Sequence, residues 1–264
     1  MHRYQVLRAV LVFVLGVGFA ASASAVPTDH LYGDLFGTNY SFTSVKETVQ
    51  TADDDPNPLF EAPALAGDSL IFTPSSFDAA AVNNAFDSTH STFNATITST
   101  STASIDIILI EEGGDYSMFG PGSDGTFVSA SMGGTLQILN STNAGDIGQI
   151  ITWGGTGSDF EAVFTPGLAP DGTSLFETNP PNGSFAWTAS VAIDIASLFP
   201  GATQVELQFN NQLQAFAAAG ASASIQKKAI DGPKITVIPE PGTAALLALG
   251  LSGLAIRSRR TRSR

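Results

Sequence analysis

The chain has 264 residues, a formal net charge of −13 and no cysteine. The absence of cysteine excludes a disulfide framework and a cysteine-ligated metal site, and the length allows one large β domain or two small ones. Seven of the 11 basic residues are arginines near the two ends, whereas all 24 acidic residues lie between Asp29 and Glu240. That middle region holds four lysines, so its formal charge is 4 − 24 = −20. Such a balance argues against nucleic acid as a partner, because phosphate binding needs clustered lysine or arginine.

The N-terminal segment has the three parts of a secretory signal. Arg3 and Arg8 form a basic start, an apolar run follows from Ala9 to Ala20, and Ala23-Ser24-Ala25 supplies small residues for signal peptidase. We therefore predict a signal helix within a signal peptide of residues 1–25, cleaved after Ala25, with Ala23 as the second choice. The alternative is an anchor helix that is not cleaved.

The C-terminal segment also has three parts in a fixed order. Pro239-Glu240-Pro241-Gly242 is stiff and non-helical, because each proline fixes its own φ and disfavours helix in the residue before it. The uncharged run 243–256 follows, and a helix there would span about 21 Å against a hydrocarbon core of about 30 Å. The run 243–256 therefore predicts a short transmembrane helix, which would insert if the arginines after it extend their side chains back to the membrane interface. The arginine-rich tail 257–264 favours a cytoplasmic end, so the acidic region faces outward.

This order of parts resembles the PEP-CTERM sorting domain of exported proteins, over residues 238–264. The resemblance implies that an exosortase in the inner membrane recognises Pro239, Glu240 and Pro241 and cleaves near them. The apolar helix and the cluster of Arg257, Arg259 and Arg260 would anchor the chain only transiently. It further implies a Gram-negative bacterium that makes exopolysaccharide, with delivery to the outer surface or the extracellular matrix. A permanent tail anchor in the inner membrane is the alternative.

The region 26–237 is predicted to be one β-rich ectodomain. Side chains alternate between apolar and polar along 94–109, 185–195 and 203–215, which is typical of strands with one face on a core and one in water. In the third segment Val205, Leu207, Phe209 and Leu213 share one face. Shorter strands are expected at 41–49, 69–73, 126–132, 136–139, 149–153, 160–165 and 221–227, with one short helix at 76–87.

Turn-rich stretches separate these strands, at 113–115, 120–125, 154–157 and 179–183. Many strands with such turns indicate an all-β fold, a two-sheet antiparallel β-sandwich resembling a jelly roll. No sustained helical period occurs in this region, so its core must be built from strands.

No catalytic motif is present in the sequence of the exported region. Its two histidines, His30 and His90, stand in no metal-binding spacing, and neighbouring acids such as Glu111 and Glu112 are typical of solvated faces. We therefore expect a protein that is not an enzyme and needs no cofactor. Structural calcium is the possible exception, because Asp53, Asp54 and Asp55 gather three hard oxygen ligands in one acidic loop.

The resulting hypothesis is an exported, non-catalytic component of the cell surface or matrix. A second hypothesis is a carbohydrate-binding module that binds the cell's own exopolysaccharide. Trp153, at a strand end before a glycine turn, is the candidate aromatic platform, whereas Trp187 falls on the apolar face of its strand and is expected in the core.

Overall fold

The computed structural model describes residues 27–49, 58–101, 103–121, 125–166, 175–178, 182–228 and 232–238. Within these ranges the regular elements are strands, apart from helix α1 (Ile195–Leu198) and a 3-10 turn at Ala144–Asp146. The all-β prediction is confirmed. The predicted signal helix and C-terminal helix lie outside the described residues.

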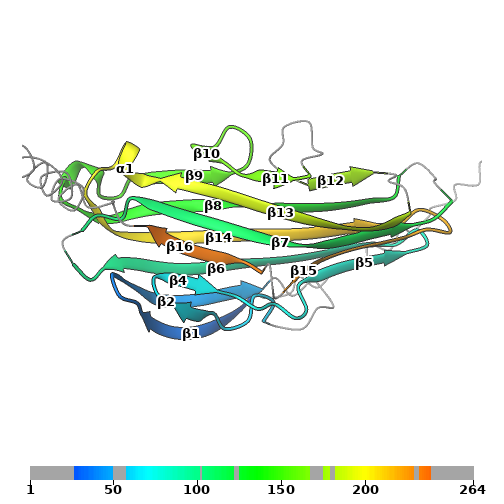
Figure 1. The fold of residues 1–264 in the computed structure, drawn as a ribbon, viewed down its shortest axis with the longest axis horizontal. Helices are drawn as coiled ribbons and strands as arrows, with labels where there is room; N and C mark the ends of the chain where they lie inside the picture. Colours follow the sequence, from blue (N-terminus) through cyan, green and yellow to red (C-terminus); the bar gives the residue numbers. More distant parts are fainter. Residues whose placement is uncertain are drawn as a thin grey trace, which may run out of the picture.

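The strands form two sheets whose longest members run along the long axis of the molecule (Figure 1). The first sheet, sheet A, has the order β1 (Thr28–Phe36), β2 (Tyr40–Val49), β6 (Phe86–Ser99), β14 (Ala202–Phe216), β8 (Phe127–Ser141), β9 (Ile150–Gly154) and β10 (Phe160–Glu161), with β12 (Leu175–Thr178) also on β8. The second, sheet B, has the order β11 (Val163–Thr165), β13 (Gly183–Asp194), β7 (Ile107–Phe119), β16 (Lys234–Ile238), β4 (Ser69–Ile71) and β3 (Ala64–Ala66). Strand β15 (Ser222–Lys227) pairs with β7 beyond β16, and β5 (Asp78–Val82) pairs with β15.

Alternation along the strands builds one core between the sheets. In β14 the predicted apolar face is buried, with Val205, Leu207, Phe209 and Leu213 fully inaccessible. Phe60 lies at the centre of an aromatic cluster, and its ring centroid is 5.2 to 6.2 Å from those of four other phenylalanines, Phe72, Phe77, Phe93 and Phe209. Burying such rings supplies the main stabilisation, since each removes a large apolar area from water.

The segment 94–109 is not one strand, contrary to prediction. β6 ends at Ser99 in sheet A and β7 begins at Ile107 in sheet B, so the residues between them carry the chain from one sheet to the other. The run of small hydroxyl residues keeps a period of two through this crossing. The period of two therefore could not show where the chain leaves sheet A for sheet B.

The short helix predicted at 76–87 is also wrong. This segment contains β5, a turn and the start of β6. Asn83 and Asn84 have φ of 53° and 64°, the left-handed conformation that asparagine tolerates better than most residues and that ends a strand sharply. The Asp87 carboxylate accepts a 2.7 Å hydrogen bond from the backbone N–H of Ala80, which holds the two strands across the turn.

Two glycine pairs lie within strands. The expected strands 126–132 and 136–139 are one strand, β8, which runs through Gly133 and Gly134, and the turn expected at 113–115 lies inside β7. A Cβ on Gly114 would overlap the backbone carbonyl of Gln226 on β15. Gly114, Gly133 and Gly134 mark close approach of another segment, which a turn-based interpretation of glycine misses.

Candidate functional site

Most of the residues predicted to direct export lie outside the described part of the chain. This holds for Ala23 and Ala25, for Pro239, Glu240 and Pro241, and for Arg257, Arg259 and Arg260. The acidic loop Asp53, Asp54 and Asp55 lies outside it as well, so the calcium prediction stays a prediction. In the described ranges no group of three potential metal ligands occurs, and no helix there is long and apolar enough to cross a membrane.

The C-terminal strand β16 carries the chain to the predicted sorting residues. β16 lies between two strands, with Ile235 opposite Ile110 of β7 on one side and Leu70 of β4 on the other. Ile235 and Val237 point into the core and are 0% and 2% exposed. The last residue of the strand, Ile238, is 37% exposed. The fold therefore holds the chain firmly up to the residue before Pro239.

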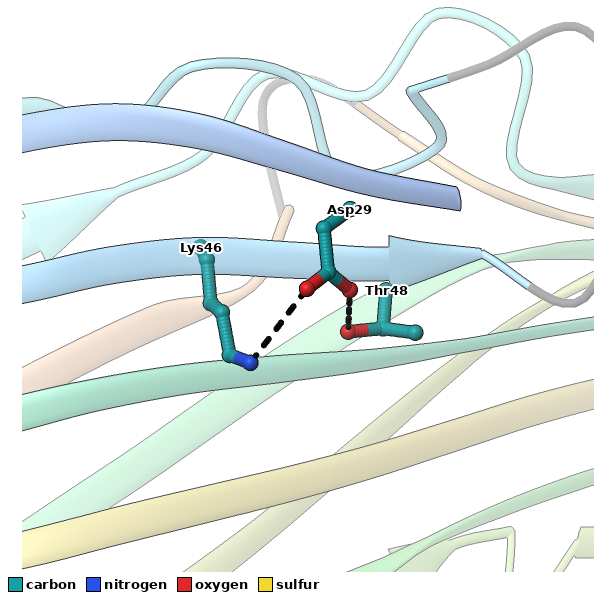
Figure 2. A network of polar contacts seen from close by, with 3 residues as sticks. All are labelled: Asp29, Lys46 and Thr48. Carbon is teal, nitrogen blue, oxygen red and sulfur yellow. Dashed lines mark hydrogen bonds and ion pairs between the residues drawn. The ribbon is translucent and has the colours of Figure 1, made fainter. Parts of the chain in front are cut away.

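The N-terminal strand β1 is an edge strand of sheet A, fastened to β2 by polar side chains (Figure 2). Asp29 accepts a 2.6 Å hydrogen bond from Thr48 and lies 3.5 Å from the ammonium of Lys46. The Thr48 hydrogen bond, more than Lys46, lowers the pKa of Asp29. These side chains are well exposed, so the contacts define register more than they add stability.

The outer face of sheet A is covered by neutral hydrogen-bonding side chains; we call it the polar face. It is formed by alternate residues of β6, β14 and β8, namely Ser88, His90, Thr92, Asn94, Gln204, Gln208, Asn210, Gln212, Ser131 and Thr135, together with the acid Glu206. They bond laterally, as when Thr92 donates to Asn210 at 2.8 Å and Gln212 donates to Ser88 at 3.1 Å. Partial burial lowers the pKa of His90, which favours the neutral imidazole. The face is thus uncharged over most of its width.

Two shallow depressions lie along the polar face. The larger, of about 320 Å³, is lined by His90, Ser131, Gly133, Asn210 and Gln212, among others. The smaller, of about 200 Å³, includes Asn94, Gln208 and the one acid Glu206. Amides and hydroxyls both donate and accept, so such hollows suit ligands rich in hydroxyl groups.

A row of three phenylalanines closes one end of the polar face. Phe216 of β14 lies opposite Phe86 of β6 on one side and Phe127 of β8 on the other. The Phe127 and Phe216 rings stack, with centroids 5.7 Å apart and an interplanar angle of 27°, and Phe86 is 56% exposed. Sequence reasoning missed this row, although the alternation of β14 already placed Phe216 on the face opposite the core.

Trp153 is among the residues that line the larger hollow, but it does not offer the exposed ring expected of an aromatic platform, and that part of the prediction needs correction. It is 2% exposed, and its ring lies 5.6 Å from that of Phe209 in the core. It shares the inner face of β9 with Ile151, and Gly134 on the neighbouring strand leaves room for the indole. Trp187 is 1% exposed, as expected for a core residue. Position at a strand end did not predict exposure, because the side-chain direction follows alternation to the last residue.

The neighbouring acids Glu111 and Glu112 do not form a facing pair. They follow one another along β7, so their side chains point to opposite sides of sheet B. Glu111 is on the outer side, in a hollow of about 440 Å³, 3.8 Å from Lys234, while Glu112 is buried. The arrangement needed for two carboxylates to act on one bond is not met by this pair.

Comparison with known proteins places one short match at the C-terminus. Residues 237–260 match the family model described as the PEP-CTERM protein-sorting motif. No curated protein matches the chain. Among solved structures, a mutant of ENZbleach xylanase is 11% identical over 81% of this chain and 91% of its own, with a TM-score of 0.17. The enzymatically active domain of tailspike protein 4 from bacteriophage CBA120 is 12% identical over 76% of this chain and 19% of its own, with a TM-score of 0.16. TM-scores this low do not indicate a shared fold.

Proposed function

We propose, on the premise that this chain carries a PEP-CTERM protein-sorting motif at residues 237–260, that its β-sandwich is the cargo of an exosortase. The motif makes the chain an exported protein that transits a membrane. Cleavage near Pro239-Glu240-Pro241 would then release the sandwich to the outer surface or matrix of a Gram-negative cell, where it serves as a non-catalytic component. The family match carries this proposal.

The arrangement of β16 supports it. The match begins on Val237 and Ile238, the last two residues of the strand, so the sorting segment starts where the sandwich ends. A cut beyond Ile238 leaves every described strand whole. Removal of the chain after Ile238 therefore leaves the core contacts among the described residues in place.

The test is processing in a host with and without its exosortase. The full chain is expressed in both, and the C-terminal peptide of the product is identified by mass spectrometry. Loss of the segment after Ile238 only in the exosortase host is expected, and Pro239→Ala with Glu240→Ala should block it. Thr243→Ala, which follows Pro239-Glu240-Pro241 but lies within the matched segment, is the control for substitution as such and should still be processed. Retention of the peptide through Arg264 in both hosts would leave a permanently anchored protein, and the sorting proposal would be abandoned.

Binding of a carbohydrate, such as the cell's own exopolysaccharide, is the second candidate function. The observation that favours it is the neutral polar face with the phenylalanine row at its end. Hydroxyl-rich ligands bind through amides and hydroxyls, and the apolar faces of sugar rings pack on aromatic rings. The ligand surface proposed here is centred on Gln212 and Phe216, in place of Trp153.

Binding would be measured by affinity electrophoresis in exopolysaccharide from the producing strain. Gln212→Ala and Phe216→Ala should each weaken binding at least about tenfold, equivalent to about 1.4 kcal/mol. Thr188→Ala, on the outer side of sheet B, is the control and should leave it unchanged. Equal retardation of all four proteins would exclude the polar face as the binding surface.

A further inference from the structure

Three polar residues interrupt the apolar inner faces of strands in the middle of the sandwich. Glu112 occupies an inner position of β7 after Ile108 and Ile110. Lys227 is the inner residue that ends β15, and Asn211 lies on the inner face of β14 between Phe209 and Leu213. β7 and β15 belong to sheet B and β14 to sheet A. The three side chains therefore meet across the core.

All three meet at one carboxylate oxygen. The Nζ of Lys227 lies 2.5 Å from Oε2 of Glu112, and the carboxamide nitrogen of Asn211 donates to the same Oε2. An amine and a carboxamide are thus held within hydrogen-bond reach of a single proton carrier. Such a placement removes the entropy cost of bringing two reactants together, which is a large part of most bimolecular barriers.

The surroundings are buried and aromatic. The side chains of Lys227 and Glu112 are 0% exposed, and Asn211 is 1% exposed. The Lys227 nitrogen lies 5.1 Å from the ring centroid of Phe77 and 5.3 Å from that of Trp187. Burial lowers the pKa of Lys227, and the nearby Glu112 offsets this only in part. Burial thus favours the neutral amine, the form of lysine that is a nucleophile.

Hydrogen bonding in this cluster is incomplete. Oδ1 of Asn211 and Oε1 of Glu112 are buried and have no hydrogen-bond partner among the described residues. Buried polar atoms are rarely left unpaired, and a buried ion pair carries a desolvation cost of its own. A reaction that turned the charged pair and the carboxamide into one neutral amide would remove the buried charges.

We propose that Lys227 and Asn211 form an intramolecular isopeptide bond, with Glu112 as the catalytic residue that transfers the protons. Glu112 takes a proton from the Lys227 ammonium, which gives a neutral amine and a carboxylic acid. The amine nitrogen attacks Cγ of Asn211 and a C–N bond forms. Glu112 gives its proton to the original Nδ2 and takes the surplus proton from the attacking nitrogen. The bond from Cγ to Nδ2 breaks and ammonia leaves, so Glu112 ends as the neutral carboxylic acid.

Atoms and electrons balance without a further reactant. An amine and a primary amide become a secondary amide and ammonia, with no change of oxidation state. A half-turn of the Asn211 carboxamide about its Cβ–Cγ bond would exchange Nδ2 for Oδ1 at Glu112. The protonated acid would then polarise the carbonyl during attack.

The bond would tie sheet A to sheet B through β14 and β15. It would serve in a chain without cysteine, exported to a setting where other proteins use disulfides. Unlike a disulfide it would be insensitive to reducing agents. The inference is independent of the sorting proposal, because it concerns only the folded sandwich.

The first test uses the unaltered full chain. Its mass after purification under reducing conditions should be lower, by one ammonia of about 17 Da, than the sequence mass calculated between the termini that the product actually has. Chymotrypsin cuts after Phe216, between the two residues, so the bond should appear as a branched peptide containing Asn211 and Lys227. A full sequence mass, with the two residues on separate unmodified peptides, would overturn the proposal.

Variants then distinguish formation of this bond from other reactions that release ammonia. Glu112→Gln keeps the size of the side chain but cannot carry the proton, and Lys227→Met removes the nucleophile, so both should show the full sequence mass. Lys228→Met and Asn210→Ala change the adjacent residues and should still form the bond. If Lys227→Met still lost ammonia, an asparagine would have cyclised on its own backbone, and the isopeptide would be refuted. Circular dichroism of each variant checks that it is folded.

Discussion

The phenol of Tyr32 donates a 2.6 Å hydrogen bond to Oε2 of Glu47, which joins the edge strand β1 to β2. The other carboxylate oxygen accepts three hydrogen bonds, from the backbone N–H groups of Leu59 and Phe60, both at 2.9 Å, and from the Ser91 hydroxyl at 2.6 Å. Glu47 is 0% exposed. One buried carboxylate therefore connects β1, β2, β6 and the segment that leads into sheet B.

Replacing Glu47 should destabilise the sandwich strongly. Glu47→Ala leaves two buried N–H groups and two hydroxyls without their acceptor, and we expect a loss of about 2–5 kcal/mol in the free energy of unfolding. Tyr32→Phe removes one donor and should cost about 1 kcal/mol. Urea denaturation measures both. Glu206→Ala, an exposed acid on the polar face, is the control and should change stability by about 0.5 kcal/mol or less.

The protein should lose stability in alkali through Tyr32 and Tyr40. Burial, with the charges of Asp106 and Asp68, raises the pKa of Tyr40 to about 12, and burial and the Glu47 hydrogen bond raise that of Tyr32. The folded state therefore holds these protons more tightly than the unfolded state, whose tyrosines titrate near pH 10. The contribution of these two protonated tyrosines to the free energy of unfolding is complete below about pH 10. It is lost as the pH rises through the pKa values that the tyrosines have in the folded state.

Thermal melting over this alkaline range provides the measurement. The unaltered protein should show a falling melting temperature above about pH 10, and a Tyr32→Phe, Tyr40→Phe double variant should show a shallower fall. Parallel curves for the two proteins would mean that other groups cause the alkaline loss.

A methyl group at Gly114 should disrupt the contact between β7 and β15. A Cβ there would overlap the Gln226 carbonyl and approach Nε1 of Trp187 to 2.9 Å. Gly114→Ala should therefore cost about 1–3 kcal/mol or more, because backbone has to move. Gly155→Ala is the matched control, since no atom lies within 4 Å of its added Cβ. Similar melting temperatures for the two variants would show that β15 adjusts freely.

Two truncations should behave differently at the C-terminal strand. A chain ending at Ile238 keeps β16, whereas one ending at Pro233 loses Ile235 and Val237 from the core and exposes the paired edges of β4 and β7. Full burial of such a side chain contributes about 1.5–3 kcal/mol, so the shorter chain should melt far lower or fail to fold. Comparable melting of both would mean that β16 is dispensable and that the boundary of the sandwich lies before Lys234.

Alternation predicted the long strands well and the connections between them poorly. Expected segments 185–195 and 203–215 correspond to β13 and β14 within two residues at either end. The helix expected at 76–87 failed because two asparagines in the left-handed conformation turn the chain between β5 and β6. The prediction of Trp153 as an exposed platform was wrong because Gly134, its partner on the neighbouring strand β8, has no side chain and leaves space for the indole in the core.

The candidate sites also combine features that follow from the sequence with features that depend on strand pairing. Phe216 and Gln212 are placed on an outer face by the alternation of β14 alone. Their neighbours Phe127 and His90 come from other strands, so the row and the hollow exist only once β6, β14 and β8 are paired.

By itself the sequence determined that this chain carries a sorting motif and that its folded part is rich in β strands. A sorting signal is a local order of prolines, apolar residues and arginines, and alternation is local as well, so neither depends on distant contacts. Only the tertiary structure decided that Glu112 meets Asn211, 99 residues away, and Lys227, 115 residues away. Such meetings depend on strand order and register across two sheets, and many orders and registers are compatible with the same period of two.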